Sequence, residues 1–228
     1  MTEDSSLFTT RNIGIIATAY AVSMIIQNAV FAASDAPGYG DPVGTVFTYH
    51  AEHRGALSVT SGMEVLNMVL VLFFVSTLHG LVKRRGGAGA DWSRLAVAAG
   101  AAFSALSALT IATHIAVVLA AGGLTEPTPA FEMMWQLHAA VFALSLPALG
   151  TTFLGVALAT HANGLTPPWQ RLLGIFGSSL LIIAGLGNLA IADGSSLVFV
   201  GVLGLFIWVV WLVVTGPRLI RDGPRRSG

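Results

Sequence analysis

The chain has 228 residues, of which 54% are hydrophobic and 10% are charged, with a formal net charge of zero at pH 7 and a mean hydropathy of +0.78. Soluble domains carry about 25% charged residues, so this composition excludes an ordinary soluble fold. The balanced charge excludes an electrostatic surface for nucleic acid. The absence of cysteine excludes disulfides, thiolate nucleophiles and Cys-ligated metal or iron–sulfur sites.

Six apolar stretches occupy nearly the whole chain and are joined by short links. A helix needs about 20 mainly apolar residues to cross a hydrocarbon core of ~30 Å, and each stretch is long enough. We therefore predict an all-α fold, with a single domain, 1–228, that forms a polytopic transmembrane bundle of six helices. The predicted spans are 12–33, 58–82, 93–121, 132–160, 170–192 and 195–216.

Lysine and arginine are distributed unequally between the two ends of these spans. Ten of the eleven fall in the tails and the even-numbered links, and Arg54 alone falls in an odd-numbered link. Because Lys and Arg remain preferentially in short cytoplasmic loops, we predict that both termini are cytoplasmic. The ten are Arg11, Lys83, Arg84, Arg85, Arg94, Arg171, Arg218, Arg221, Arg225 and Arg226.

The first link, 34–57, is the longest segment outside the predicted spans. Its first part is rich in Pro, Gly and Asp, which is typical of a loop. Residues 43–54 have the spacing of a short amphipathic helix with Phe47, His50 and Arg54 on one side. We expect this segment to cover the outer end of the bundle. The polar residues of the cover are Tyr49, His50, Glu52, His53 and Arg54.

Proline and glycine in the later spans predict how the helices pack. Pro147 lies inside the fourth span and should kink it. Gly174 and Gly185 fall on one stripe of the fifth span, and Gly201 and Gly204 fall on one stripe of the sixth. Small residues let helices approach closely in lipid, so we expect both stripes to be helix contacts.

Three short motifs flank the second and fifth spans. They are Tyr49, His53 and Arg54 before the second span, Thr-Leu-His-Gly-Leu at its end (77–81), and Pro-Trp-Gln-Arg-Leu-Leu-Gly at the start of the fifth (168–174). In these motifs the chain resembles an uncharacterised family of six-span actinobacterial integral membrane proteins of unknown function. The resemblance implies a six-helix fold in a bacterial inner (plasma) membrane, and it implies no reaction.

Polar side chains are expensive inside a membrane, so those within the spans are candidate functional groups. Five spans carry them at comparable depth in the half nearer the 34–57 link, whereas the other half holds only His79 and His161, at span ends. We predict that the first group lines an outward-facing pocket for a small or lipophilic molecule. The candidate residues are Gln27, Asn28, Glu64, Asn67, His114, Glu132, Gln136, His138 and Asn188.

Glu64 and His114 are the main candidates for chemistry in this pocket. A carboxylate and an imidazole in low dielectric form an acid–base pair, which favours a membrane-embedded enzyme; alternatively, the two are hydrogen-bonded packing partners. In the fourth span, Glu132 and Gln136 share a face and His138 points away from them. That span therefore offers either the one face or the other to the pocket.

A metal site in the first link is a further alternative. His50, Glu52 and His53 lie within four residues, and imidazole and carboxylate ligands suit copper or zinc. The chain has no His-x-x-x-His or His-Glu-x-x-His spacing. These residues therefore also fit a solvated interfacial loop.

Haem b is the other cofactor considered, because a bundle cytochrome holds its haem between histidines of different spans at equal depth. By depth, His114 pairs with His138, and His79 pairs with His161. His138 and His161 leave the fourth span at different angles, which argues against two haems stacked along it.

The sequence thus favours an inner-membrane protein, surrounded by the lipid bilayer, that binds a small or lipophilic molecule without a cofactor. A membrane enzyme using Glu64 and His114, a di-haem electron-transfer protein and a structural membrane subunit are the alternatives. The sequence leaves homo- and hetero-oligomers open.

Overall fold

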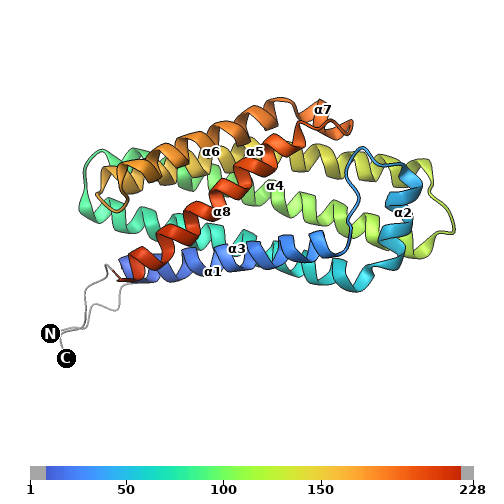
Figure 1. Cartoon of the computed structure of the whole chain (residues 1–228), viewed down its shortest axis with the longest axis horizontal. Helices are drawn as coiled ribbons and strands as arrows, with labels where there is room; N and C mark the ends of the chain where they lie inside the picture. Colours follow the sequence, from blue (N-terminus) through green and yellow to red (C-terminus); the bar gives the residue numbers. More distant parts are fainter. Residues whose placement is uncertain (1–8, 222–228) are drawn as a thin grey trace.

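The computed structural model describes residues 9–221, which contain helices and no strand. The long helices run back and forth along one axis (Figure 1). The helices are α1 (Thr10–Ala33), α2 (Val43–Glu52), α3 (Arg54–Arg85), α4 (Gly89–Gly123), α5 (Pro129–Ala162), α6 (Pro168–Leu186), α7 (Asn188–Ala192) and α8 (Val198–Arg221).

Six of these helices, α1, α3, α4, α5, α6 and α8, are long and apolar enough to cross a membrane. The chain is therefore a multi-pass membrane protein, and the predicted all-α architecture with six spans is confirmed. The helices α2 and α7 have 10 and 5 residues and are too short to span. The short helix predicted at 43–54 corresponds to α2, which ends one residue before α3 begins.

The fifth predicted span, 170–192, differs from the structure. α6 ends at Leu186, and Gly187 separates it from α7. A Cβ at Gly187 would overlap the side chain of Leu197, so the loop before α8 packs directly on this glycine. The apolar pattern of the predicted span continues past this glycine, so the pattern alone does not mark the end of α6.

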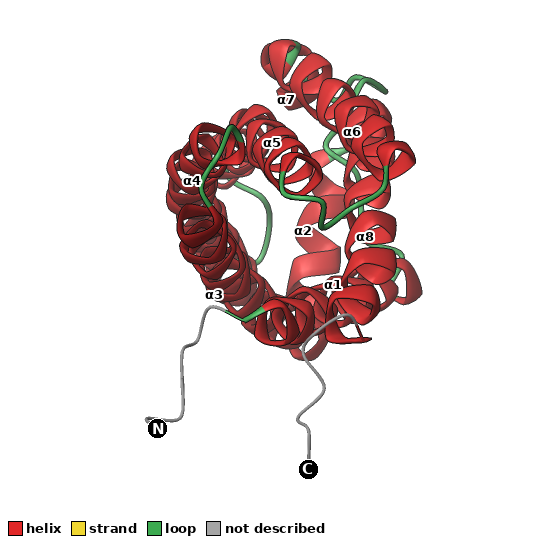
Figure 2. Ribbon diagram, turned by 90° about the vertical axis from the view of Figure 1, so that its left-hand side faces the viewer, coloured by secondary structure: helices red, strands yellow, loops and turns green. Residues whose placement is uncertain are grey.

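The six long helices form a closed ring. In the order α1, α3, α4, α5, α6 and α8, each packs on the next, and α8 packs back on α1 (Figure 2). α2 lies across one end of the ring, where it packs on α4 and α3. We call this the α2 end, and we call the opposite end, where α1 begins and α8 ends, the basic end.

Small residues bring neighbouring helices into backbone contact, as the sequence predicted. A Cβ at Gly185 of α6 would overlap the ring of Pro147 in α5, and one at Gly174 would overlap Ala157. A Cβ at Gly204 of α8 would lie 2.9 Å from the carbonyl oxygen of Gly177 in α6. α5 continues through Pro147 as one helix.

Aromatic side chains fill the ring toward the basic end. Trp208 and Trp211 of α8 stack with ring centroids 5.8 Å apart, and Phe153 of α5 lies 4.7 Å from Trp208. Tyr20 and Phe74 complete the cluster, each with its ring 6.1 Å from Trp208. All five are buried, so this half of the ring is a packed core rather than a channel.

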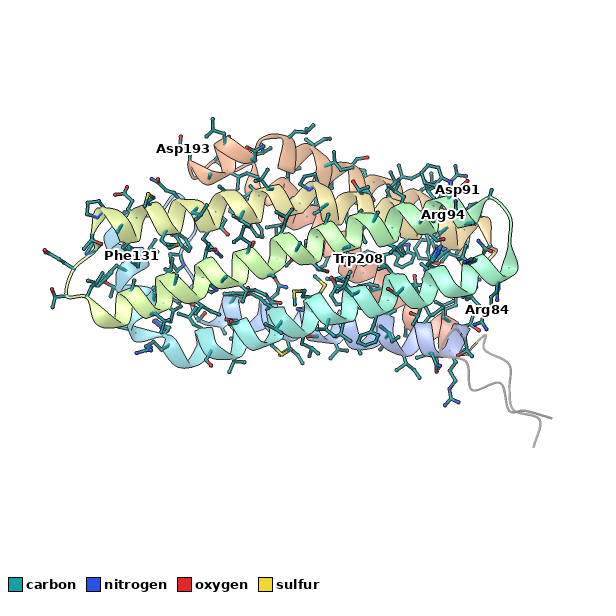
Figure 3. The ribbon with its side chains drawn as sticks, turned by 180° about the vertical axis from the view of Figure 1, so that it is seen from behind. Arg84, Asp91, Arg94, Phe131, Asp193 and Trp208 are labelled. Carbon is teal, nitrogen blue, oxygen red and sulfur yellow. The ribbon has the colours of Figure 1, made fainter. Side chains whose placement is uncertain are left out.

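The charged side chains follow the two ends of the bundle. Arg84, Asp91 and Arg94 lie at the basic end, and Asp193 lies at the opposite end (Figure 3). Among the Lys and Arg of residues 9–221, only Arg54 lies at the α2 end, while Arg225 and Arg226 fall outside the described residues. The asymmetry on which the orientation prediction rests is therefore kept in three dimensions.

Candidate functional site

A cavity of about 130 Å³ lies inside the ring between the aromatic cluster and the α2 end. Five helices, α1, α3, α4, α5 and α8, contribute to its wall. The wall is mainly apolar. Its apolar residues include Phe103, Ile111, Phe142, Leu146, Leu149 and Leu205, and its polar residues are Gln27, Glu64, Asn67, Ser107, Thr110 and Ser145.

Three of the predicted residues form a hydrogen-bonded chain in this wall. Asn67 donates from Nδ2 to Oε1 of Gln27 over 2.6 Å, and Gln27 donates from Nε2 to Oε1 of Glu64 over 3.3 Å. The second oxygen of Glu64, Oε2, and Oδ1 of Asn67 are buried and have no hydrogen-bond partner among the described residues. Two acceptors in the wall are therefore buried beside the cavity without a partner in residues 9–221.

Two of the three hydroxyls in the wall are already engaged within their own helices. The hydroxyl of Thr110 donates to the carbonyl of Leu106 over 3.0 Å, and that of Ser145 donates to the carbonyl of Phe142 over 2.7 Å. Among the described residues that line this cavity there is no Lys, Arg or His. An ionised carboxylate in such surroundings needs a positive partner, and the wall does not supply one to Glu64.

Tyr39, in the loop between α1 and α2, packs beside the cavity on the side of the α2 end. Its ring centroid lies 5.6 Å from that of Phe142 in the cavity wall, 5.1 Å from Trp135 and 5.8 Å from His138. Burial, and to a lesser degree the carboxylate of Glu64, raises the pKa of Tyr39. The phenol is therefore neutral and near Glu64.

The loop that carries Tyr39 is anchored at Gly40. A Cβ on Gly194, which has φ 85°, would overlap the Cα of Gly40, so the two backbones are in direct contact. The Pro, Gly and Asp content of this segment predicted a loop but indicated no role for Tyr39. The available signal was an aromatic residue placed between two glycines, Gly38 and Gly40, in an otherwise polar loop.

A cluster of histidines lies beside the cavity, closer to α2. The rings of His50 and His114 are 5.5 Å apart, and those of His114 and His138 are 5.1 Å apart. Nδ1 of His50 donates to the carbonyl of Val46 over 2.7 Å, and Nδ1 of His138 donates to that of Thr110 over 3.1 Å. Burial lowers the pKa of His50, and the bond to Val46 opposes this shift in part.

The cluster does not form a metal site in this structure. Within residues 9–221 no group of three or more His, Cys, Asp or Glu side chains is placed to hold a metal ion. Of the residues considered for copper or zinc, His53 stacks on Tyr49 with ring centroids 4.6 Å apart, Glu52 is exposed, and His50 is turned toward His114.

The histidine pairs considered for haem are not arranged as axial ligands. His114 and His138 are in ring contact, which leaves no space for a porphyrin between them. His79 is bonded to Ser93 at 2.8 Å, and Nδ1 of His161 donates to the carbonyl of Thr166 over 3.2 Å. His79 and His161 are thus each bonded to a residue that lies just beyond the end of their own helix in the sequence.

The acid–base pair of Glu64 and His114 is not formed either. The two line different cavities, and no hydrogen bond or ion pair joins them among the described residues. Of the two candidate faces of the fourth span, α5, the structure buries the face of His138. Glu132 and Gln136, on the other face, are exposed. The structure thus divides the predicted pocket into an acceptor cavity and a separate histidine cluster.

The remaining amides bond within their own helices. Asn28 donates to the carbonyl of Met24 over 2.8 Å, and Asn188 donates to that of Gly185 over 3.2 Å. Neither lines the cavity. In the cover, the hydroxyls of Tyr49 and Ser34 are 2.7 Å apart, which ties α2 to the end of α1.

No family model, curated protein or solved structure matches this chain. The resemblance to six-span actinobacterial proteins therefore rests on the three short motifs alone. Function has to be argued from the geometry of the cavity.

Proposed function

We propose that this membrane protein binds a small molecule in the cavity between α1, α3, α4, α5 and α8, and that the molecule donates hydrogen bonds to Glu64 and Asn67. The observation that carries the proposal is the pair of buried acceptors without partners, Glu64 Oε2 and Asn67 Oδ1. A buried polar atom left unsatisfied costs about 1–3 kcal/mol. A purely structural network would pair these atoms, whereas a binding site keeps them open.

The cavity supports a compact ligand with one polar end. Its volume of about 130 Å³ is close to the ~150 Å³ of a cavity that holds one benzene molecule. Phe103, Leu146 and Leu205 provide apolar contacts, and the acceptors lie on the α1 and α3 side. An amine or alcohol on a small hydrocarbon body matches this distribution, and an ammonium group would also neutralise Glu64.

The surroundings support a site that is closed at one end. The aromatic cluster around Trp208 fills the ring toward the basic end, and Tyr39 lies over the opposite side of the cavity. Entry from the α2 end then passes the loop that carries Tyr39. With the orientation predicted from Lys and Arg, that end faces outward from a bacterial inner membrane.

Benzylamine and toluene test the proposal, because they are similar in size and only benzylamine carries an ammonium group. We expect benzylamine to raise the thermal midpoint of the detergent-purified protein more than toluene does. Glu64→Gln should weaken benzylamine binding roughly 10-fold to 150-fold, the value of a hydrogen bond to a charged group. Glu132→Gln, on the exposed face of α5, is the matched control and should bind as the wild type does.

Two results would contradict the proposal. One is an equal response to toluene and benzylamine, which would show that the acceptors contribute nothing. The other is unchanged benzylamine binding in Glu64→Gln. In either case a structural role for the Gln27–Glu64–Asn67 chain would be the better explanation.

A further inference from the structure

A second concavity, of about 270 Å³, lies between α3 and α4 at the α2 end and is separate from the acceptor cavity. α3 and α4 run side by side on the face of the bundle seen in Figure 3. Arg54, Ser58 and Ser61 line the groove from α3, and His114, Ile115 and Leu119 line it from α4. This groove does not depend on the proposed amine site.

Hydrogen-bond donors in this groove lack partners. Among the described residues, Arg54 makes no hydrogen bond and no ion pair. Its guanidinium packs on Gly122 of α4, where an added Cβ would lie 2.9 Å from Nη1. The hydroxyls of Ser58 and Ser61 are likewise without partners in residues 9–221, whereas the neighbouring Thr60 donates to the carbonyl of Leu57.

The donors form one stripe. Residues 54, 58 and 61 are spaced i, i+4 and i+7, so their side chains share one face of α3. His114, which is 5% exposed, faces the same groove from α4 and has no hydrogen bond within the described range. A guanidinium, two hydroxyls and an imidazole that converge without an acceptor are complementary to an anion with several oxygens, such as a phosphate.

The groove opens on the outer surface of the ring. Ile115 and Leu119 are 45% and 59% exposed, and Val59 on the adjoining face of α3 is 54% exposed. In a spanning helix such residues contact lipid chains. Arg54 is the first residue of α3 and lies at the level where a span meets the headgroups. The phosphate that reaches this position is therefore one attached to acyl chains.

We infer that the groove between α3 and α4 binds an anionic phospholipid, with its phosphate on Arg54, Ser58 and Ser61 and an acyl chain along Ile115 and Leu119. Arg54 is the single basic residue at the α2 end of the described chain, and no acidic side chain is paired with it. Its positive charge therefore selects a lipid of net negative charge over a zwitterionic one.

Native mass spectrometry of the full chain in detergent, titrated with phosphatidylglycerol, tests this inference. We expect one tightly held lipid per chain in the wild type and roughly tenfold weaker retention in Arg54→Gln, the loss expected for a charge-assisted contact. Arg94→Gln is the matched control, because Arg94 lies at the basic end and pairs with Asp91. It should retain the lipid as the wild type does.

The hydroxyls give a second, smaller test that leaves the charge intact. Replacing Ser58 and Ser61 together by alanine should weaken phosphatidylglycerol roughly threefold to tenfold. Ser179→Ala is the control, since that exposed hydroxyl donates to the carbonyl of Ile175 in its own helix. Equal retention by the double variant and the wild type would contradict the assigned phosphate position.

Two further probes separate the possible sources of the phosphate. Phosphatidylcholine with the same acyl chains should bind more weakly than phosphatidylglycerol, and inorganic phosphate at millimolar concentration should not displace the lipid. Equal binding of the two lipids, or full retention in Arg54→Gln, would overturn the inference. Displacement by inorganic phosphate that depends on Arg54 would overturn the lipid assignment and indicate a site for a free anion.

Discussion

α3 carries two regions of opposite chemistry that follow one another along the helix. Arg54, Ser58 and Ser61 present donors in the groove beside α4, whereas Glu64 and Asn67 carry buried acceptors in the wall of the acceptor cavity. The first three share one face of the helix, and the last two are rotated away from it. One helix can therefore present donors toward the bilayer and acceptors toward the interior of the bundle, because side chains on different faces of the helix meet different neighbours.

The two regions also differ in the ligands that they can bind. The donor groove is open and lies at the start of a span, so its ligand is an anion that reaches it along the membrane surface. The acceptor cavity lies between five helices, and Tyr39 packs on Phe142 in its wall, so its ligand is compact and brings its own donors. A change that disturbs one region should leave the other intact.

The largest effect is expected from the contact that holds the loop over the cavity. Gly194→Ala adds a Cβ where Gly40 already lies, at a residue with φ 85°. The left-handed conformation costs about 1–2 kcal/mol, and overpacking costs about 1–3 kcal/mol more. We expect a clear fall in thermal midpoint and faster benzylamine exchange, with phosphatidylglycerol retention unchanged.

Gly164→Ala is the matched control for this variant. Gly164 has φ 67° and open space around its Cβ position. Gly164→Ala therefore carries the cost of the left-handed backbone without any overpacking. If the two variants lose the same stability, the contact between Gly40 and Gly194 contributes nothing. Lipid loss in Gly194→Ala alone would show that the two regions are coupled, against the comparison above.

A smaller effect of opposite sign is expected at Glu64. Glu64→Gln keeps an acceptor for Gln27 and replaces a buried carboxyl that has an unpaired oxygen with a neutral amide. We expect the protein without ligand to become more stable by about 0.5–2 kcal/mol, in the range typical of substitutions that relieve a functional site. Thermal unfolding without and with benzylamine measures both changes.

The same substitution at Glu132, which is exposed, should leave the thermal midpoint unchanged. A loss of stability in Glu64→Gln would mean that the carboxyl holds the bundle together and is not kept for a ligand. That result would contradict a ligand-binding role for the acceptor cavity and would not affect the inference about the donor groove.

The pH dependence of stability should report on His50, which adjoins the donor groove through His114. Because burial lowers the pKa of His50 in the folded protein, the unfolded chain binds more protons below its own pKa of about 6.5. The stability contributed by neutral His50 is complete above that pH and is lost as the pH falls toward the folded-state value. Thermal midpoints should therefore decrease on acidification through this window.

His50→Gln should flatten this dependence, since the substituted amide does not titrate. Thr48→Gln, at an exposed position of the same helix, should keep it. His114 and Tyr49 are the titratable side chains whose rings face His50. An unchanged slope in His50→Gln would assign the pH response to another group.

The sequence was sufficient to predict an all-α fold with six helices long and apolar enough to span a membrane. Apolar runs of about 20 residues are dictated by the thickness of the bilayer, and the spacing at 43–54 predicted α2. The break at Gly187 was not predicted because the apolar pattern continues past it, and the packing of Gly187 on Leu197 is a tertiary contact that the pattern does not reveal.

The candidate site was predictable only in part, because depth does not identify neighbours. Gln27, Glu64 and Asn67 were placed at one level and do meet, since α1 and α3 are adjacent in the ring. His114 was placed at the same level as Glu64, yet it turns to the groove and the histidine cluster. Rotation and ring order decide such contacts, and a single sequence specifies neither.

The smallest effect is expected from Arg94→Gln, which is the reference for the other variants. Arg94→Gln removes the exposed ion pair with Asp91, whose atoms are 3.1 Å apart at i, i+3 on α4. Exposed pairs of this kind contribute about 0.2–0.5 kcal/mol and are screened by salt, so the thermal midpoint should hardly move. Benzylamine and phosphatidylglycerol binding should both equal the wild type. Weakened phosphatidylglycerol in this variant would show that lipid responds to basic residues at either end, and the selectivity assigned to Arg54 would then be lost.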